Sequence, residues 1–342
     1  MPYDILNWDD IEEYYTDAVL LGNGASIALH PCFGYNSLLQ QARSEGHISQ
    51  EIEELFEHFD TQDFEFLLRR IWQANIVNET LEIDESVTGN IYDDLRRALI
   101  DSVRDNHADF SDVNHHFDEI SDFCVHFDSV VSLNYDITLY WAIQSHNESD
   151  DKDVFIKDCF AGPMNRFDYD WQRFREVIRN GIQGSTLVFY PHGNLLICTD
   201  QMGRVMKLSR NRDTQYLLDV VEQRWQSNEY APLFVSEGDA RQKFSAISRS
   251  PYLNTVYNEV LPNLGESITV YGWSFSDEDD HILDSLFRHS ESIERVAVSV
   301  YTEGSGDPSQ FCEYVDDKIR DRIGSQTTVH FFDSASEGAW IH

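Results

Sequence analysis

Residues 18–26 read Ala-Val-Leu-Leu-Gly-Asn-Gly-Ala-Ser, and this stretch points most directly to the fold. The apolar run from Ala18 to Leu21 predicts a short buried strand, and the glycines after it predict a tight turn. Such a turn lets backbone amides approach a phosphate group at the start of a helix. We therefore expect a Rossmann-type nucleotide site made by Gly22, Asn23, Gly24, Ala25 and Ser26. In the alternative interpretation the glycines only turn the chain, since neither a full G-x-G-x-x-G nor a P-loop sequence is present.

Six further apolar runs predict the remaining strands. They lie at residues 129–134, 185–190, 233–235, 267–271, 296–301 and 328–332. Helical patterns lie between and before them, at residues 35–45, 137–145, 214–226, 251–261, 278–288 and 308–322. Continuous apolar strands that alternate with helices indicate a parallel sheet covered on both faces. The sequence therefore predicts an α/β fold with a Rossmann-like parallel sheet of about six strands.

Residues 49–126 differ from the rest of the chain. Their apolar residues fall at mostly helical intervals, and no strand pattern interrupts them. We interpret this segment as an inserted all-helical module. The predicted organisation is a nucleotide-binding domain made of residues 1–48 and 127–342, with the module between its first two strands.

The charge balance of the chain is strongly acidic. There are 61 Asp and Glu residues against 25 Lys and Arg residues, a formal net charge of −36 at pH 7. A dispersed acid excess with few lysines is typical of halophilic proteins, because salt screens the repulsion between surface carboxylates. The alternative is an acidic protein that works at an ordinary salt concentration. Since nucleic-acid binding needs a basic face, we expect no direct nucleic-acid binding.

Cysteine spacing and hydropathy argue against several other classes. The five cysteines form no C-x-x-C pair, so neither a disulfide framework nor a structural zinc site is expected. No apolar run approaches the ~20 residues of a membrane span, and the acidic N-terminus is not typical of a signal peptide. We expect a cytoplasmic protein that has no membrane partner.

Two short polar motifs follow predicted strands. In Asn134-Tyr-Asp136, the amide and the carboxylate would orient a water molecule and accept an amide hydrogen bond, or else cap the next helix. In His192-Gly193, the glycine leaves the imidazole accessible as a general base near neutral pH. A structural histidine is the alternative at this position.

A third motif, Gly272-Trp-Ser274, suits a backbone turn with a hydroxyl aimed at a ribose or phosphate. The acidic run at 277–280, followed by His281, suits the first turn of a helix. Its carboxylates lack the spacing of metal ligands, so we expect no metal there. Because the carboxyl ends of parallel strands lie at one edge of a sheet, we expect these motifs and the first glycine turn to line a single crevice.

The order G-x-G-A-S, N-x-D, H-G and G-x-S is similar to that of the sirtuin-like superfamily of NAD-binding proteins. The resemblance covers almost the whole chain and is closer to a prokaryotic branch of that superfamily without zinc. It implies a Rossmann-like sheet with inserted helical elements. It also implies that Gly22, Gly24, Ala25 and Ser26 hold the dinucleotide phosphates, that Asn134 and Asp136 line the nicotinamide pocket, that His192 is the base, and that Gly272 and Ser274 meet the ribose and phosphate side.

The resemblance implies NAD as substrate or ligand and no zinc, since the cysteines cannot supply the four-cysteine module of the protein deacylases. Related zinc-free proteins include NAD-cleaving effectors of antiphage defence, so we expect an NAD glycohydrolase that cleaves the nicotinamide–ribose bond. The alternative is a sensor or scaffold that binds NAD or ADP-ribose without turnover. A homo-oligomer or a partner encoded in the same operon is the expected assembly.

Overall fold

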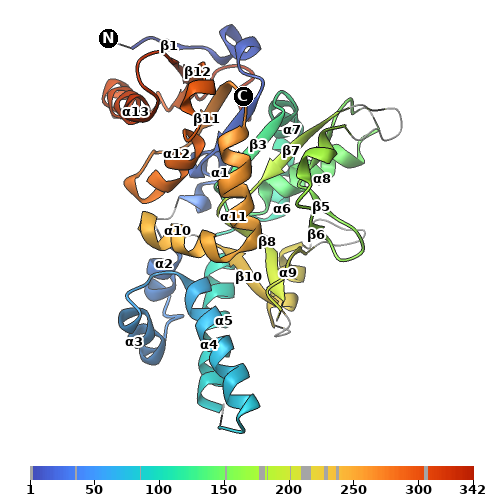
Figure 1. Cartoon of the computed structure of the whole chain (residues 1–342), viewed down its shortest axis with the longest axis vertical. Helices are drawn as coiled ribbons and strands as arrows, with labels where there is room; N and C mark the ends of the chain where they lie inside the picture. The colour runs from blue at the N-terminus through green and yellow to red at the C-terminus, as the bar shows by residue number, and fades with distance from the viewer. Residues whose placement is uncertain are drawn as a thin grey trace.

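The computed structural model describes residues 3–34, 37–84, 86–150, 152–176, 182, 184–200, 202–208, 217–226, 230–235, 239–303 and 307–342. Within these residues the strands form one 8-stranded sheet and one 5-stranded sheet (Figure 1). Every pairing in the larger sheet is parallel. The predicted α/β class with a Rossmann-like parallel sheet is confirmed, with eight strands in place of about six.

The larger sheet has the strand order β1-β13-β12-β11-β2-β3-β7-β4. Its strands are β1 (Ile5–Leu6), β13 (Thr328–Asp333), β12 (Arg295–Val300), β11 (Ser267–Tyr271), β2 (Ala18–Leu21), β3 (Ser129–Ser132), β7 (Ser185–Phe189) and β4 (Phe155–Lys157). Strands β3, β7 and β4 lie on one side of β2, and the later strands β11, β12 and β13 lie on its other side. Ligands of open α/β sheets bind where the strand order reverses in this way, beyond the carboxyl ends of the strands.

The smaller sheet is antiparallel and has the order β10-β8-β9-β6-β5. Its strands are β10 (Tyr230–Phe234), β8 (Gly193–Asp200), β9 (Val205–Lys207), β6 (Arg166–Phe167) and β5 (Phe160–Ala161). The strand predicted at 233–235 was therefore assigned to the wrong sheet. Four of the five residues of β10 are buried, so its sequence reads as a continuous apolar run like that of a parallel strand.

The segment predicted to be helical contains α3 (Gln50–His58), α4 (Phe64–Thr80), α5 (Ser86–Asp105), α6 (Phe110–Val113) and α7 (Phe117–Val125). The helical character of this segment is confirmed in its described residues. Helices α4 and α5 lie side by side and project from the sheets at one end of the molecule (Figure 1). Helix α7 instead packs against α8 (Thr138–Glu148), next to the parallel sheet. The division into two domains stays a prediction.

The remaining helices are α1 (Asn23–Leu29), α2 (Leu38–Ser44), α9 (Leu217–Gln226), α10 (Ala240–Arg249), α11 (Pro251–Thr255), α12 (Asp280–Leu286) and α13 (Pro308–Ile323). Helix α10 was not predicted, although it has a capping box at Asp239 and Gln242. Parts of two predicted helices, residues 35–36 and 214–216, lie outside the described residues. Across the described helices, none combines the length and apolar character that crossing a bilayer requires.

Both ends of the chain lie at the same end of the molecule and close the larger sheet (Figure 1). The ring of Trp8 packs against Phe332 of β13 and Phe123 of α7, with ring centroids 4.9 and 5.8 Å away. The indole of Trp340 donates a hydrogen bond of 2.9 Å to the carbonyl of Ala25. The C-terminal tail is therefore joined to the first turn of α1.

Candidate functional site

The carboxyl ends of the central strands are level with one another. Leu21 of β2 pairs with Ser132 of β3 on one side and with Tyr271 of β11 on the other. The residues that follow each strand, Gly22 and Gly272 among them, therefore leave the sheet at the same edge. The predicted convergence of the motifs follows from this register.

A cavity of about 1040 Å³ lies at this edge. This volume is at the upper end of the range found for small-molecule sites. Among the predicted site residues, those that line the cavity are Gly22, Asn23, Gly24, Asn134, Asp136, His192, Gly272 and Ser274. Three others do not line it: Ala25 and Ser26 are buried beneath the turn, and Gly193 packs against β10.

The glycines of the two turns are needed because two backbones touch. A Cβ atom on Gly22 would lie 2.6 Å from the carbonyl oxygen of Gly272, and one on Gly24 would lie 2.8 Å from the same oxygen. Gly272 itself has a φ of +67°, and its Cβ would meet the backbone of Ala25. These contacts support the interpretation in which the glycines shape the chain.

The same contacts occupy amides that were predicted to hold phosphates. The N–H of Gly22 donates to the carbonyl of Tyr271 (2.9 Å), and the N–H of Gly24 donates to the carbonyl of Gly272 (2.7 Å). The N–H of Ala25 donates to the carbonyl of Gly22 (3.0 Å). A phosphate bound here would have to share these donors, so the phosphate role of the glycine turn stays a prediction.

A chain of hydrogen bonds joins Asn134, Ser26 and Asp136. The side-chain amide of Asn134 donates to the Ser26 hydroxyl (2.9 Å) and to the carbonyl of Gly22 (3.0 Å). The Ser26 hydroxyl in turn donates to Oδ2 of Asp136 (2.6 Å). Because a backbone carbonyl only accepts, the Nδ2 end of Asn134 is fixed, and its Oδ1 is left as an acceptor.

Both carboxylate oxygens of Asp136 accept hydrogen bonds from other residues of the protein. Its Oδ1 accepts the backbone N–H of Thr138, the first residue of α8, at 2.8 Å. Its side chain is buried, and Oδ2 is bonded to Ser26. Asp136 precedes Ile137, the N-cap residue of α8, so it is not itself the N-cap; one of its oxygens accepts the first N–H of the helix and the other orients Ser26.

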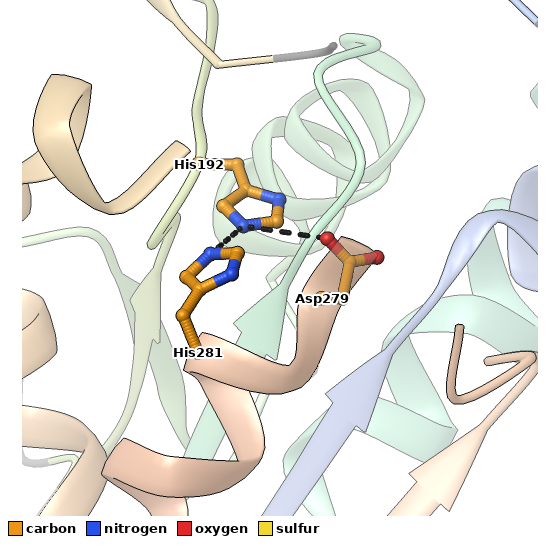
Figure 2. Close-up of side chains that lie close together, drawn as sticks. All are labelled: His192, Asp279 and His281. Carbon is orange, nitrogen blue, oxygen red and sulfur yellow. Dashed lines mark hydrogen bonds and ion pairs between the residues drawn. The ribbon is translucent and has the colours of Figure 1, made fainter. Parts of the chain in front are cut away.

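His192 lies in the turn that links the two sheets and is buried against α12. Its Nε2 is 2.9 Å from Nε2 of His281 and 3.9 Å from Oδ1 of Asp279 (Figure 2). Figure 2 shows the other ring nitrogen of His192, Nδ1, on the side of the ring away from His281. Burial lowers the pKa of His192 to about 3 and that of His281 to about 4. Both rings are therefore neutral at pH 7.

Lys243 of α10 completes this group of side chains. Its buried ammonium donates to Oδ1 of Asp279 at 2.7 Å. Burial alone would raise the pKa of Asp279, but His192 and Lys243 outweigh it and the pKa is lowered. A partly buried ion pair, Lys243–Asp279, thus adjoins a neutral histidine pair.

Several residues of this edge were not predicted to be functional. Lys243 comes from the helix that the sequence analysis missed, and Asp279 and His281 were interpreted only as the first turn of a helix. The cavity is also lined by the carboxylates Glu278, Glu303 and Asp307. The two-residue spacing of Asp279 and His281 does not by itself predict a site. Their neighbour in space, His192, is 87 residues away from Asp279 in the chain.

Comparison with known proteins assigns the chain to a family without assigning an activity. No curated protein matches the chain. A family model described as "Domain of unknown function (DUF4917)" matches residues 19–340. This range includes both sheets except β1 and the first residue of β2, and all residues of the cavity edge named above. The chain belongs to the DUF4917 family.

Proposed function

We propose that this protein binds NAD in the cavity at the carboxyl edge of the parallel sheet and hydrolyses its nicotinamide–ribose bond. The observation that carries the proposal is the fixed amide of Asn134 on the cavity wall. Both of its N–H groups are used by protein acceptors, and its Oδ1 remains to accept a hydrogen bond from a ligand or a water molecule. An acceptor that is held in advance costs little reorganisation when the reaction occurs.

The hydrogen-bond chain behind Asn134 strengthens that acceptor. The negative charge of Asp136 attracts the hydroxyl proton of Ser26, and the hydroxyl oxygen in turn polarises the amide of Asn134. Hydrogen bonds in a row reinforce one another in a buried environment. Asp136 and Ser26 therefore act as positioning residues in this proposal, and Asn134 is the residue that meets the reacting atoms.

The charge of the cavity suits the reaction. Among the described residues, five side-chain carboxylates line it, those of Asp136, Glu278, Asp279, Glu303 and Asp307, against one side-chain ammonium, that of Lys243. Cleavage of NAD develops positive charge on the ribose ring, starting from a cationic nicotinamide. Negative groups placed where positive charge develops favour the transition state. The ammonium of Lys243 is already paired with Asp279, so the dinucleotide phosphates would have to share it with that carboxylate.

The reaction balances with water as the second reactant. The bond between the anomeric carbon and the nicotinamide nitrogen breaks, and its electron pair neutralises the pyridinium ring. The oxygen of a water molecule held by Asn134 Oδ1 bonds to the anomeric carbon. Its proton goes to Nδ1 of neutral His192 and then to solvent, which leaves ADP-ribose and nicotinamide.

A second candidate function is NAD or ADP-ribose binding without turnover. The lowered pKa of His192, about 3, favours this candidate, because a ring with so low a pKa is a weak base near neutral pH. The negative charge of a bound diphosphate would raise that pKa in the enzyme. The two candidates therefore share the cavity and differ in whether His192 accepts a proton.

The two candidates are separated by measuring free nicotinamide after incubation of the protein with NAD in molar KCl. The enzyme releases nicotinamide, and His192→Ala lowers its rate by roughly 10²–10⁴-fold, the usual contribution of a general base. The sensor releases none, although NAD raises its melting temperature by mass action. If the protein releases no nicotinamide and NAD does not shift its melting temperature, both candidate functions are refuted.

A further inference from the structure

His192, Asp279 and His281 form a group of nitrogen and oxygen atoms with the composition of a transition-metal site. One ligand atom from each side chain lies within 4.8 Å of the other two. Both histidines are buried, and Asp279 is partly buried. Two imidazoles and one carboxylate, with further positions open, are the ligand set of many zinc and iron enzymes.

The spacing of the two imidazole nitrogens fits a shared ion. Nε2 of His192 and Nε2 of His281 are 2.9 Å apart. Two nitrogens bound at about 2.0–2.1 Å from one ion lie about 2.9 Å apart when the angle between the bonds is about 90°. Both nitrogens point at the same place in Figure 2, with the carboxylate of Asp279 beside it. A divalent ion can therefore replace the proton that the two rings share.

The environment of His281 supports this arrangement. The backbone carbonyl of Glu278 offsets a small part of the lowering of the His281 pKa that burial causes, although the buried Nδ1 of His281 makes no well-formed hydrogen bond. A carbonyl can only accept, so it favours the ring form with the proton on Nδ1 and the lone pair on Nε2. Metal-binding histidines are commonly oriented by a carbonyl in this way.

The carboxylate of Asp279 is shared with Lys243. The ammonium lies 2.7 Å from Oδ1, the oxygen that is 3.9 Å from His192. An ion bound to both histidines requires the carboxylate to move inward by roughly 0.5 Å, and the ammonium competes with the ion for the same negative charge. Removal of the ammonium should therefore strengthen metal binding.

We propose that His192, Asp279 and His281 bind a divalent transition metal ion of the zinc class. This reverses the expectation from the sequence, which lacked the contribution of His192. A histidine bound to metal through Nε2 keeps its proton on Nδ1 and cannot accept another. The ion therefore switches NAD hydrolysis off; this consequence rests on the proposed function.

The test is Co²⁺ binding by the full chain after treatment with EDTA, followed by visible absorption and thermal unfolding. Wild-type protein should bind one Co²⁺, with an absorption band that Zn²⁺ removes, and its melting temperature should rise with the metal concentration. Asp279→Asn and His281→Gln should each weaken binding by about 100-fold or more while circular dichroism shows an unchanged fold. Lys243→Met should tighten binding.

The matched control is the pair of His115, which is exposed, and His116, which is half-buried; their ring centroids are 4.0 Å apart, and they offer an alternative site for metal. The double variant His115→Ala, His116→Ala should bind Co²⁺ as the wild type does. The proposal is overturned if wild type binds no Co²⁺ at millimolar concentration, if binding survives His281→Gln, or if this double variant alone loses it.

The metal site and the proposed function fail in different ways. Co²⁺ binding with no release of nicotinamide leaves the metal site standing and refutes the enzyme. Release of nicotinamide that persists in saturating Zn²⁺, in a protein that binds the ion, overturns the switch. Release of nicotinamide without Co²⁺ binding refutes the metal site alone.

Discussion

The buried histidine pair should make the protein sensitive to mild acid. His192 and His281 have pKa values lowered to about 3 and about 4 by burial, against about 6.5 for an unfolded histidine. Below pH 6.5 the unfolded chain therefore binds protons that the folded chain does not. The stability that this difference contributes is fully present above pH 6.5 and is lost as the pH falls through about 4 for His281 and about 3 for His192.

The size of the effect follows from the two shifts. At pH 5 each ring lies about 1.5 pH units below its unfolded pKa, which corresponds to about 2 kcal/mol of lost stability for each histidine. The two rings are hydrogen-bonded and titrate as a pair, so about 4 kcal/mol is an upper limit for both. This is a large part of the 5–15 kcal/mol that stabilises a typical domain.

The assay is urea unfolding followed by tryptophan fluorescence at pH 8, 6.5 and 5 in constant molar KCl. Protonation of carboxylates also changes stability over this range, so the comparison is with the double variant His192→Gln, His281→Gln, which keeps every carboxylate. The variant should lose less stability than the wild type between pH 6.5 and 5. His289→Gln, at an exposed position, is the matched control. Equal losses in the wild type and the double variant would refute the account of the buried pair.

Three further predictions concern the glycine turns, the salt requirement and the hydrogen-bond chain. Gly272→Ala should lower the free energy of unfolding by about 2 kcal/mol or more. Gly89→Ala, in the open part of α5, should raise it by up to about 1 kcal/mol. Equal effects of the two substitutions in urea unfolding would contradict the backbone contact. Raising KCl from about 0.1 M to molar concentration should raise the melting temperature, because the net charge of −36 repels itself in dilute salt; an unchanged temperature would count against a halophilic protein. Ser26→Ala should lower kcat for nicotinamide release about tenfold, the value of one hydrogen bond, and leave NAD binding nearly unchanged; an unchanged kcat would show that the chain from Asp136 does not act on the reaction.

The central part of the fold could be predicted because its strands are short, apolar and separated by helices. The strand at Ala18–Leu21 and the strand at Ser267–Tyr271 lie where the sequence analysis placed them. The edge strands Ile5–Leu6 and Phe155–Lys157 have two and three residues, too few to show a period. The strand of residues 230–234 carries the same apolar pattern as a parallel strand, because burial on both faces depends on what covers it and not on its direction.

The site was predictable only where its residues follow strands. Asn134 and His192 reach the cavity because strand ends in a parallel sheet meet at one edge, which the strand pattern implies. The contacts that decide their roles were not predictable. That Gly24 packs against Gly272, or that His281 faces His192, depends on how distant segments meet, and neither residue type nor spacing encodes that meeting.

The most direct test of the account is NAD turnover by Asn134→Ala in molar KCl, with Asn263→Ala, an exposed asparagine outside the cavity lining, as the matched control. The Asn134→Ala protein should release no nicotinamide while NAD still raises its melting temperature, because the placed acceptor serves the transition state more than ground-state binding. Asn263→Ala should release nicotinamide as the wild type does. Full turnover by a folded Asn134→Ala protein would contradict the account and would place the chemistry outside this part of the cavity.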